Sequence, residues 1–326
     1  MRRVVRLYIA GILALLLLAS CANTQSESVR TESVEPPSVT EVLAPITIAV
    51  LPSLDAFPIF IAQEMGFFEE NGLTVNLERF SSARDRDVAF QTVDTIDGLI
   101  FDLVALSIYA ESGMDMVAAS STIGLASLIG AEGVESLDDL AGSTVLISRS
   151  TSMEYILDRA LLAANLSPDD VIIEEVPALP TRLEMLLHGQ AGAATLPEPF
   201  ATMARDAGLN VITTTQELGI NPFILAFQRE TVEEKTAELQ AFFKGVNAAI
   251  DYLNASDREA FIDILIDVVG YPEDARDTLL LPEFSHLVPL EASYAKDVLD
   301  FARDYGLLTR ELTEADIIVD VFGLRQ

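Results

Sequence analysis

The stretch ITIAVLPSLDAFPIFIAQEMGFFEENGLTVNLERF, residues 46–80, contains the pattern that decides the fold. It opens with a β-rich run at 46–51, which a proline-serine pair brings to an end. Residues 57–70 are helical in pattern and stop at an Asn-Gly pair, a common sequence at the carboxyl end of a helix. Residues 73–80 then alternate apolar and polar side chains, as a half-buried strand does. The stretch predicts a strand, a helix and a second strand in succession.

The same alternation of strands and helices continues along the chain, in two series separated by a turn at 130–133. Further strands are expected at 98–105, 116–121, 144–148, 171–176, 192–196, 211–214 and 223–227. At about 100–200 residues per domain, a chain of 326 residues is long enough for two globular units. We therefore predict an α/β fold with mixed, mostly parallel sheets and flanking helices.

The amino terminus has the features of an export signal. Three arginines in the first six residues are followed by an apolar stretch of 11 residues at 8–18. A transmembrane helix needs about 20 apolar residues, so this stretch is too short to span a bilayer. It ends in Leu18-Ala19-Ser20-Cys21, which resembles the lipobox of bacterial lipoproteins. In such signals the cysteine is acylated and becomes the first residue after cleavage.

The lipobox implies a signal peptide at 1–20 and an acyl chain such as palmitate on Cys21. Residues 21–45 are rich in Ser, Thr, Glu, Val and Pro and lack apolar periodicity, so we predict a flexible tether there. The body of the protein would then lie outside the cytoplasm, anchored to the cell membrane by its lipid. The alternatives are an ordinary secretory signal with a chance cysteine and a short membrane anchor.

The charge and composition of the chain exclude several classes of function. Asp and Glu number 51 against 20 Lys and Arg, which gives a formal net charge of −31. Such a surface repels a phosphate backbone, so we expect no nucleic acid partner. One cysteine cannot form a disulfide within the chain, and there is no CxxC or Cys/His cluster in the sequence to hold zinc or an iron–sulfur cluster. We therefore expect neither a metal nor a cofactor.

Five segments, in this order along the chain, resemble the solute-binding proteins of bacterial ABC importers for thiamine precursors, nitrate and sulfonates. They are AQEMGFFEENGLTV at 62–75, DVAFQ at 87–91, IDG at 96–98, SLDDLAGSTV at 136–145 and LPEPF at 196–200. The resemblance covers about residues 46–260. It departs from the family at 92–95, where TVDT replaces a glycine that relatives usually have ahead of the Ile-Asp pair. That departure leaves the ligand subfamily open.

The resemblance implies the two-lobe, type II fold of periplasmic binding proteins, in which two crossover segments join the lobes. One lobe is expected to comprise residues 46–124 and 224–326, and the other residues 125–223. Such a protein captures a small organic molecule by closing its lobes and delivers it to a membrane permease, which works with an ATPase subunit. We expect a monomer on the periplasmic or outer side of the membrane, without enzymatic activity.

Candidate ligand-binding residues follow the predicted strands, because ligands of open α/β sheets bind beyond the carboxyl ends of the strands. In the first lobe these residues are Ser53, Asp55, Phe57, Ser82, Arg84 and Asp102. In the second lobe they are Ser148, Arg149, Ser150, Thr151, Tyr155, Glu198 and Phe200. The carboxylates would accept hydrogen bonds from N–H groups of a solute, and the aromatic rings would stack on a flat ring. This set favours a flat nitrogen heterocycle, such as a thiamine-precursor pyrimidine or riboflavin.

The loop at 148–152 supports the main alternative, an anionic solute. It opens a predicted helix, whose unpaired amides favour an anion, and it adds four hydroxyl groups and Arg149. A sulfonate or nitrate could bind there. The other interpretation of this loop is ordinary helix capping by Ser150 or Thr151, which needs no ligand.

Other candidates also have a structural interpretation. Each acidic residue can be a solvated surface group, and Phe57 and Phe200 can pack in the core. On an exposed helix, two arginines can pair with neighbouring acids, namely Arg84 and Arg86 with Asp85 and Asp87.

Two further classes of protein compete with a transport binding protein. Enzymes of the same fold family make the thiamine pyrimidine, but those relatives carry a cysteine-rich motif and use a lysine and a histidine. The lysines of the predicted body, Lys235, Lys244 and Lys296, fall in late helices, far in sequence from the candidate loops. The other class is a receptor or adhesin without a transport role.

Overall fold

The computed structural model describes residues 42–80, 83–93, 95–277, 279 and 281–323. The predicted signal peptide, Cys21, nearly all of the predicted tether and Ser82 lie outside the described residues. Within the described part of the chain, no helix combines the length and the apolar character that crossing a bilayer requires.

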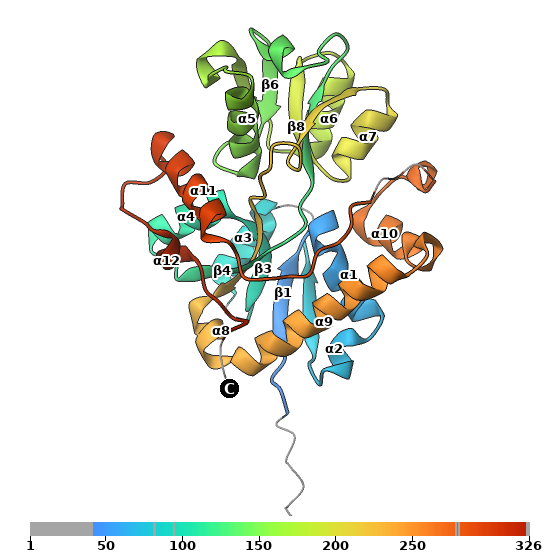
Figure 1. Ribbon diagram of the computed structural model, residues 1–326, viewed down its shortest axis with the longest axis vertical. Coiled ribbons are helices and arrows are strands. Elements are labelled where there is room, and N and C mark those ends of the chain that lie inside the picture. The colour runs from blue at the N-terminus through green and yellow to red at the C-terminus, as the bar shows by residue number, and fades with distance from the viewer. Residues whose placement is uncertain (1–41, 81–82, 94, 278, 280, 324–326) are drawn as a thin grey trace, which may run out of the picture. The chain divides into compact units, whose positions relative to one another are not determined.

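Two five-stranded sheets form the two lobes of the protein (Figure 1). The first-lobe sheet has the order β2 (Val75–Arg79), β1 (Ile46–Val50), β3 (Gly98–Asp102), β10 (Phe223–Gln228) and β4 (Met116–Ser121). The second-lobe sheet has the order β7 (Ile172–Glu175), β6 (Thr144–Ile147), β8 (Ala193–Pro197), β5 (Ala126–Gly130) and β9 (Asn210–Thr214). In each sheet only one strand, β10 or β5, runs against its neighbours. These are the mixed, mostly parallel sheets that the sequence predicts.

The pairing registers place the carboxyl ends of both sheets at the crossovers. The first crossover, 122–125, leaves the carboxyl end of β4 and enters β5, whose first residue pairs with Pro197 at the carboxyl end of β8. The second crossover, 215–222, leaves the carboxyl end of β9 and enters β10, whose first residue pairs with Asp102 at the carboxyl end of β3. Both connections run from one carboxyl edge to the other. The two carboxyl edges therefore face each other.

Helices cover both sheets. Those of the first lobe are α1 (Phe57–Glu64), α2 (Phe67–Glu70), α3 (Ala83–Thr92), α4 (Leu103–Ser112), α8 (Arg229–Glu234), α9 (Thr236–Ala255), α10 (Ile262–Val269), α11 (Ala292–Asp304) and α12 (Glu314–Ile317). Those of the second lobe are α5 (Ser152–Ala163), α6 (Leu179–Leu187) and α7 (Phe200–Asp206). Helices α1 and α2 pack against α9, where the rings of Phe68 and Phe242 stack 5.3 Å apart. The helical end of the chain thus completes the core of the first lobe.

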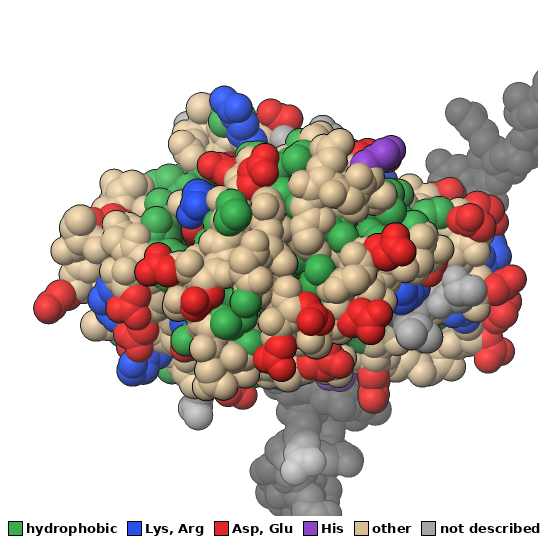
Figure 2. All heavy atoms as spheres, turned by 90° about the horizontal axis from the view of Figure 1, so that it is seen from above, with side chains coloured by type: hydrophobic (Ala, Val, Ile, Leu, Met, Phe, Trp, Pro, Cys, Tyr) green, Lys and Arg blue, Asp and Glu red, His purple; other side chains and the backbone are tan. Residues whose placement is uncertain are grey.

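The exposed charge is mostly negative. Figure 2 shows Asp and Glu side chains spread over the face seen from above, with few Lys and Arg among them. This distribution matches the formal net charge of −31.

The helix expected at 57–70 is in fact two helices, α1 and α2. They are separated at Gly66, whose φ of +80° is left-handed and cannot continue an α-helix. The strand expected at 98–105 ends at Asp102, because this side chain caps α4 by accepting a hydrogen bond from the Ala105 amide at 2.9 Å.

The turn expected at 130–133 was placed too early, because Gly130 is the last residue of β5. A side chain at Gly130 would meet the carbonyl oxygen of Val134 at 2.1 Å, so only glycine lets the strand pass this turn. In this segment the glycine marks a close backbone approach, and the sequence prediction treated it as the turn itself.

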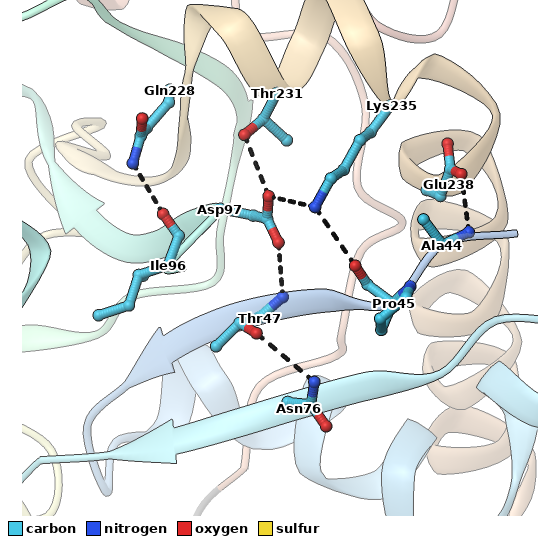
Figure 3. Close-up of polar contacts among 10 residues, drawn as sticks. All are labelled: Ala44, Pro45, Thr47, Asn76, Ile96, Asp97, Gln228, Thr231, Lys235 and Glu238. Carbon is cyan, nitrogen blue, oxygen red and sulfur yellow. Dashed lines mark hydrogen bonds and ion pairs between the residues drawn. The ribbon is translucent and has the colours of Figure 1, made fainter. Parts of the chain in front are cut away.

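A buried acid joins the amino ends of β1 and β3 to α8 and α9 (Figure 3). Asp97 is 8% exposed and accepts a hydrogen bond from the Thr47 amide at 2.8 Å. Its other oxygen pairs with Lys235 at 2.7 Å and accepts from the Thr231 hydroxyl at 3.3 Å. Lys235 also donates to the Pro45 carbonyl at 3.3 Å. The network fixes the start of β1 at the edge opposite the carboxyl ends of the strands.

Replacing Asp97 with Asn should lower the free energy of unfolding by about 1–3 kcal/mol, because Lys235 would lose its carboxylate partner in a largely buried place. Urea unfolding measures the change. The matched control is Asp115→Asn, which removes a 2.7 Å ion pair with Arg229 at an exposed site and should change stability little. Equal losses in the two variants would contradict a special role for Asp97.

Candidate functional site

Several of the predicted first-lobe residues lie on one edge of the sheet. Ser53 and Asp55 follow β1, and Asp102 is the last residue of β3. Because β1 is parallel to both β2 and β3, these positions share the carboxyl edge. Arg84, in α3 after β2, is exposed.

The two acids of this edge are desolvated. Burial raises the pKa of Asp102 to about 6, against a smaller lowering by the Ala105 amide and by Arg86. Burial also raises the pKa of Asp55, while a hydrogen bond from the Ser53 hydroxyl acts in the opposite direction. The charge of Arg86 lowers the pKa of both carboxyl groups, so both lie within electrostatic reach of this one guanidinium.

Arg86 is a buried cation near this edge, whereas the sequence analysis considered it only as a partner of neighbouring acids on an exposed helix. It is 5% exposed, pairs with Asp87 at 2.7 Å and donates to the Ile100 carbonyl at 2.7 Å. Its guanidinium lies over the ring of Phe101, 5.0 Å from the centroid. The predicted pairing of Arg86 with Asp87 is therefore present, although on the buried side of α3.

Several donors of the second-lobe loop at 148–151 are already bonded within the loop or to Glu154. The Ser150 amide donates to Glu154 at 2.7 Å, and Arg149 pairs with the other oxygen of Glu154 at 3.0 Å. Thr151 caps α5 by accepting a hydrogen bond from the Met153 amide at 3.1 Å. Glu154, only 4% exposed, thus binds both the Ser150 amide and Arg149 and places a negative charge beside the loop. Thr151 thus caps the helix, as in the interpretation of this loop that needs no ligand.

Arg182, in α6, holds the same loop through a hydrogen bond to Ser148. It is fully buried, and its donors reach the carbonyl groups of Val176 at 2.9 Å and Thr195 at 2.7 Å. A third bond goes to the Ser148 hydroxyl. Burial alone lowers the pKa of Arg182 to about 10. One side chain of α6 thereby joins the segments that follow β6 and β7 to the middle of β8, and no sequence pattern indicated it.

Glu198 and Phe200 follow β8. Glu198 is half-buried, and burial raises its pKa, against a lowering by Thr202 and by the charge of Arg205. The Thr202 amide donates to its carboxylate at 3.3 Å. Phe200 is the first residue of α7 and packs, half-buried, against the second-lobe core. Because β8 is parallel to β6, Glu198 shares the carboxyl edge of its sheet with the 148–151 loop.

Two of the predicted aromatic residues lie in the core instead of on an edge. Phe57 is 0% exposed, with its ring centroid 6.1 Å from that of Phe261 and 6.2 Å from that of Phe284. Tyr155 is 1% exposed and packs against Phe301 at 5.4 Å. A ring without exposed surface has no face to stack on a solute, so we leave both residues out of the proposed site.

Comparison with solved structures gives several matches across the chain. The periplasmic aliphatic sulphonate binding protein SsuA from Escherichia coli is 18% identical with a TM-score of 0.74, covering 86% of this chain and 94% of its own. The periplasmic nitrate-binding protein NrtA from Synechocystis PCC 6803 is 15% identical with a TM-score of 0.67, covering 82% and 83%. The desulfurization enzyme DSZB is 12% identical with a TM-score of 0.60, covering 85% and 96%. The predicted binding-protein fold is confirmed.

Comparison with curated protein sequences gave no significant match. A family model does match, over residues 40–269, and its description is the NMT1-like family. The matched segment contains all five segments that carry the resemblance. Because this match spans more than half of the chain, the protein belongs to the NMT1-like family.

Proposed function

We propose that this protein is the solute-binding component of an ABC importer, which captures a small molecule between its two carboxyl edges by lobe closure. The observation that carries the proposal is the arrangement of the crossovers, which makes these edges face each other. Half-buried acids lie on both of them, Asp55 and Asp102 on the first and Glu198 on the second. Sites at such edges, built on two lobes, suit a ligand that is enclosed and then released.

The charges of the two edges favour a solute that donates hydrogen bonds. Three desolvated carboxyl groups gain from N–H donors, whereas an anion beside them would be repelled. In the 148–151 loop the Ser150 amide already donates to the Glu154 carboxylate at 2.7 Å, and this charge disfavours an anion beside it. The proposed solute is therefore a small nitrogen heterocycle, with hydrogen bonding to the carboxyl groups as the main source of affinity. An anion such as a sulfonate or nitrate is the alternative.

The remaining features of the proposal concern location and partners. A lipid on Cys21 would hold the monomeric body at the outer or periplasmic side of the membrane, where a permease with its ATPase subunit would receive the solute. The proposal includes no catalysis. The enzyme alternative needs a lysine at the site, but Lys235 forms an ion pair with Asp97 at 2.7 Å, at the edge opposite the site.

The test is a thermal-unfolding panel of solutes on the purified protein. A ligand present at 100 times its dissociation constant adds about 2.7 kcal/mol to the stability of the folded state, which raises the melting temperature measurably. We expect a rise with a pyrimidine or flavin and none with methanesulfonate or nitrate. A rise with the anions alone would favour the alternative, and conversion of a solute, seen by chromatography, would indicate an enzyme. A melting temperature unchanged by every compound would overturn the proposal.

A further inference from the structure

A hollow apart from the proposed solute site lies between the end of α9, the start of α10 and the loop at 279–284. In Figure 1 this end of α9 and α10 lie together at the right of the first lobe. The volume of the hollow is about 520 Å³, which is within the range of small-molecule sites. Its apolar lining consists of Leu253, Phe261, Leu279, Leu281, Pro282 and Phe284.

Arg258 brings an incompletely paired cation to the wall of this hollow. It opens the short 3₁₀ helix Arg258–Ala260, between α9 and α10, and its Nη1 donates to the Leu279 carbonyl at 2.7 Å. Its Nε and Nη2 have no hydrogen-bond partner among the described residues, and both nitrogens are closed to solvent. A charged donor without an acceptor, in a place that water does not reach, is costly. The arrangement therefore suits an acceptor that enters with a ligand.

The two unpaired nitrogens form one edge of the guanidinium, and the same edge holds carboxylates elsewhere in this chain. Arg86 donates through its Nε and Nη2 to Asp87, at 2.8 and 2.7 Å. Arg205 donates through the same two atoms to Asp206, at 3.2 and 3.1 Å. Such an edge also matches the paired oxygens of a carboxylate or a sulfonate. The open edge of Arg258 therefore favours an oxyanion.

The wall of the hollow is held in place without any ligand. The Asn254 side chain donates to the Phe284 carbonyl at 2.7 Å and accepts from the Phe284 amide at 3.1 Å, which fixes the far end of the loop at 279–284 to α9. The rings of Phe261 and Phe284 also pack on Phe57, with centroids 6.1 and 6.2 Å away. A wall that is ordered beforehand lowers the entropic cost of binding.

The acid at the rim does not outweigh the buried cation. Glu283 lines the hollow but is exposed, so water and salt weaken its repulsion of an entering anion. The open edge of Arg258 is shielded from water, where its attraction for an anion is stronger. The apolar lining in turn gains from contact with a hydrocarbon chain. A fitting ligand therefore carries both an oxyanion and an apolar chain.

We infer that this hollow is a second binding site, which takes a small organic anion. Its carboxylate or sulfonate group binds the Nε and Nη2 of Arg258, and its chain packs against the apolar lining. The inference goes beyond the proposed function and does not depend on it, because none of the residues named for the hollow belongs to the two carboxyl edges that hold the solute.

Octanoate is the probe, and a tryptophan at the rim reports its binding. The chain has no tryptophan of its own, so Glu283→Trp supplies a single fluorophore at the hollow. Leu162→Trp, at an exposed position of α5 on the second lobe, supplies a remote one. We expect octanoate to change the emission of the first reporter with a dissociation constant of about 1 mM or less, and to leave the second unchanged. Octanamide, which has the same chain without the charge, should bind about tenfold more weakly or worse.

Substitutions of Arg258 in the rim reporter locate the oxyanion. Arg258→Lys and Arg258→Met should each weaken octanoate binding about tenfold or more, because neither side chain supplies the planar edge. The matched control is Arg276→Met, since this guanidinium already pairs with Asp263 and Glu273, each at 2.7 Å. It should leave the affinity for octanoate unchanged.

Thermal unfolding of the wild-type chain gives a measurement that needs no reporter. Octanoate should raise the melting temperature, and octanamide at the same concentration should raise it much less. Equal effects of the two compounds would overturn the inference, as would an equal loss of affinity in the Arg258 and Arg276 variants. It would also be overturned if octanoate changed neither the rim emission nor the wild-type melting temperature.

Discussion

Replacing Asp102 with Asn is expected to make the protein more stable at pH 8 and weaker at binding its solute. In the folded protein burial raises the pKa of Asp102 from 3.8 to about 6. The folded state therefore holds this proton more tightly than the unfolded state, so wild-type stability falls as the pH rises from about 4 to about 6. Asn is as good a helix cap as Asp, so α4 keeps its cap while the desolvated charge is lost.

The expected gain at pH 8 is about 1–3 kcal/mol in the free energy of unfolding, and it should vanish at pH 4. The same substitution should lower the affinity for the solute that the thermal-unfolding panel identifies by about 10- to 100-fold, because a donor on the solute loses its charged acceptor. Urea unfolding at the two pH values and calorimetric titration measure the two effects. Asp138→Asn, at an exposed site on the second lobe, controls for the loss of one negative charge.

Opposite signs in the two measurements are what distinguish a binding residue from a structural one. A variant that loses stability at pH 8 would show that the Asp102 charge is well compensated in the folded protein. Unchanged affinity in the presence of increased stability would remove Asp102 from the site.

Replacing Arg182 with Met should cost about 2–5 kcal/mol in the free energy of unfolding. The side chain is fully buried and its donors serve two carbonyl groups and the Ser148 hydroxyl. Methionine fills much of the space and donates nothing, so buried acceptors at three strands lose their partners. Because Ser148 opens the loop before α5, solute affinity should fall together with stability.

Arg205→Met is the matched control for this loss. Arg205 pairs with Asp206 at 3.1 Å on the surface of α7, so its replacement should change stability little. Arg182→Lys should fall between the two, because an ammonium group can reach only some of the acceptors that the planar guanidinium serves together. A loss in Arg182→Met no larger than in the control would show that water or neighbouring groups replace these bonds.

The sequence allowed the fold to be predicted because most of its signals are local. Runs such as residues 46–51 and 116–121 carry their own β-pattern, and glycines or prolines end them. The errors arose where a long-range contact decides the structure. Gly130 belongs to a strand because it pairs with Ala193 and Asn210, and it must be glycine because the Val134 carbonyl leaves no room for a side chain. The alternation of apolar residues there was too short to detect.

The candidate site was predicted in part for the same reason. Acids at strand ends, such as Asp55 and Asp102, can be found from the position of the strands alone. The burial of Phe57 and Tyr155 could not, because the residues that cover them come from the end of the chain. Arg182 was missed since its partners, at Val176, Thr195 and Ser148, are brought to it only by the fold.

The position of β10 has a consequence for the order in which the chain can fold during synthesis. In the first-lobe sheet the strand partner of β4 is β10, and the isolated bridges of β4 go to Pro289 and Ile318, so the strand at 116–121 has no β partner until residues 223–228 have been made. The second-lobe sheet draws all its strands from the continuous segment 126–214. The second-lobe sheet can therefore be completed during synthesis before the first-lobe sheet, which needs β10, although β1 to β4 of the first lobe are synthesised earlier.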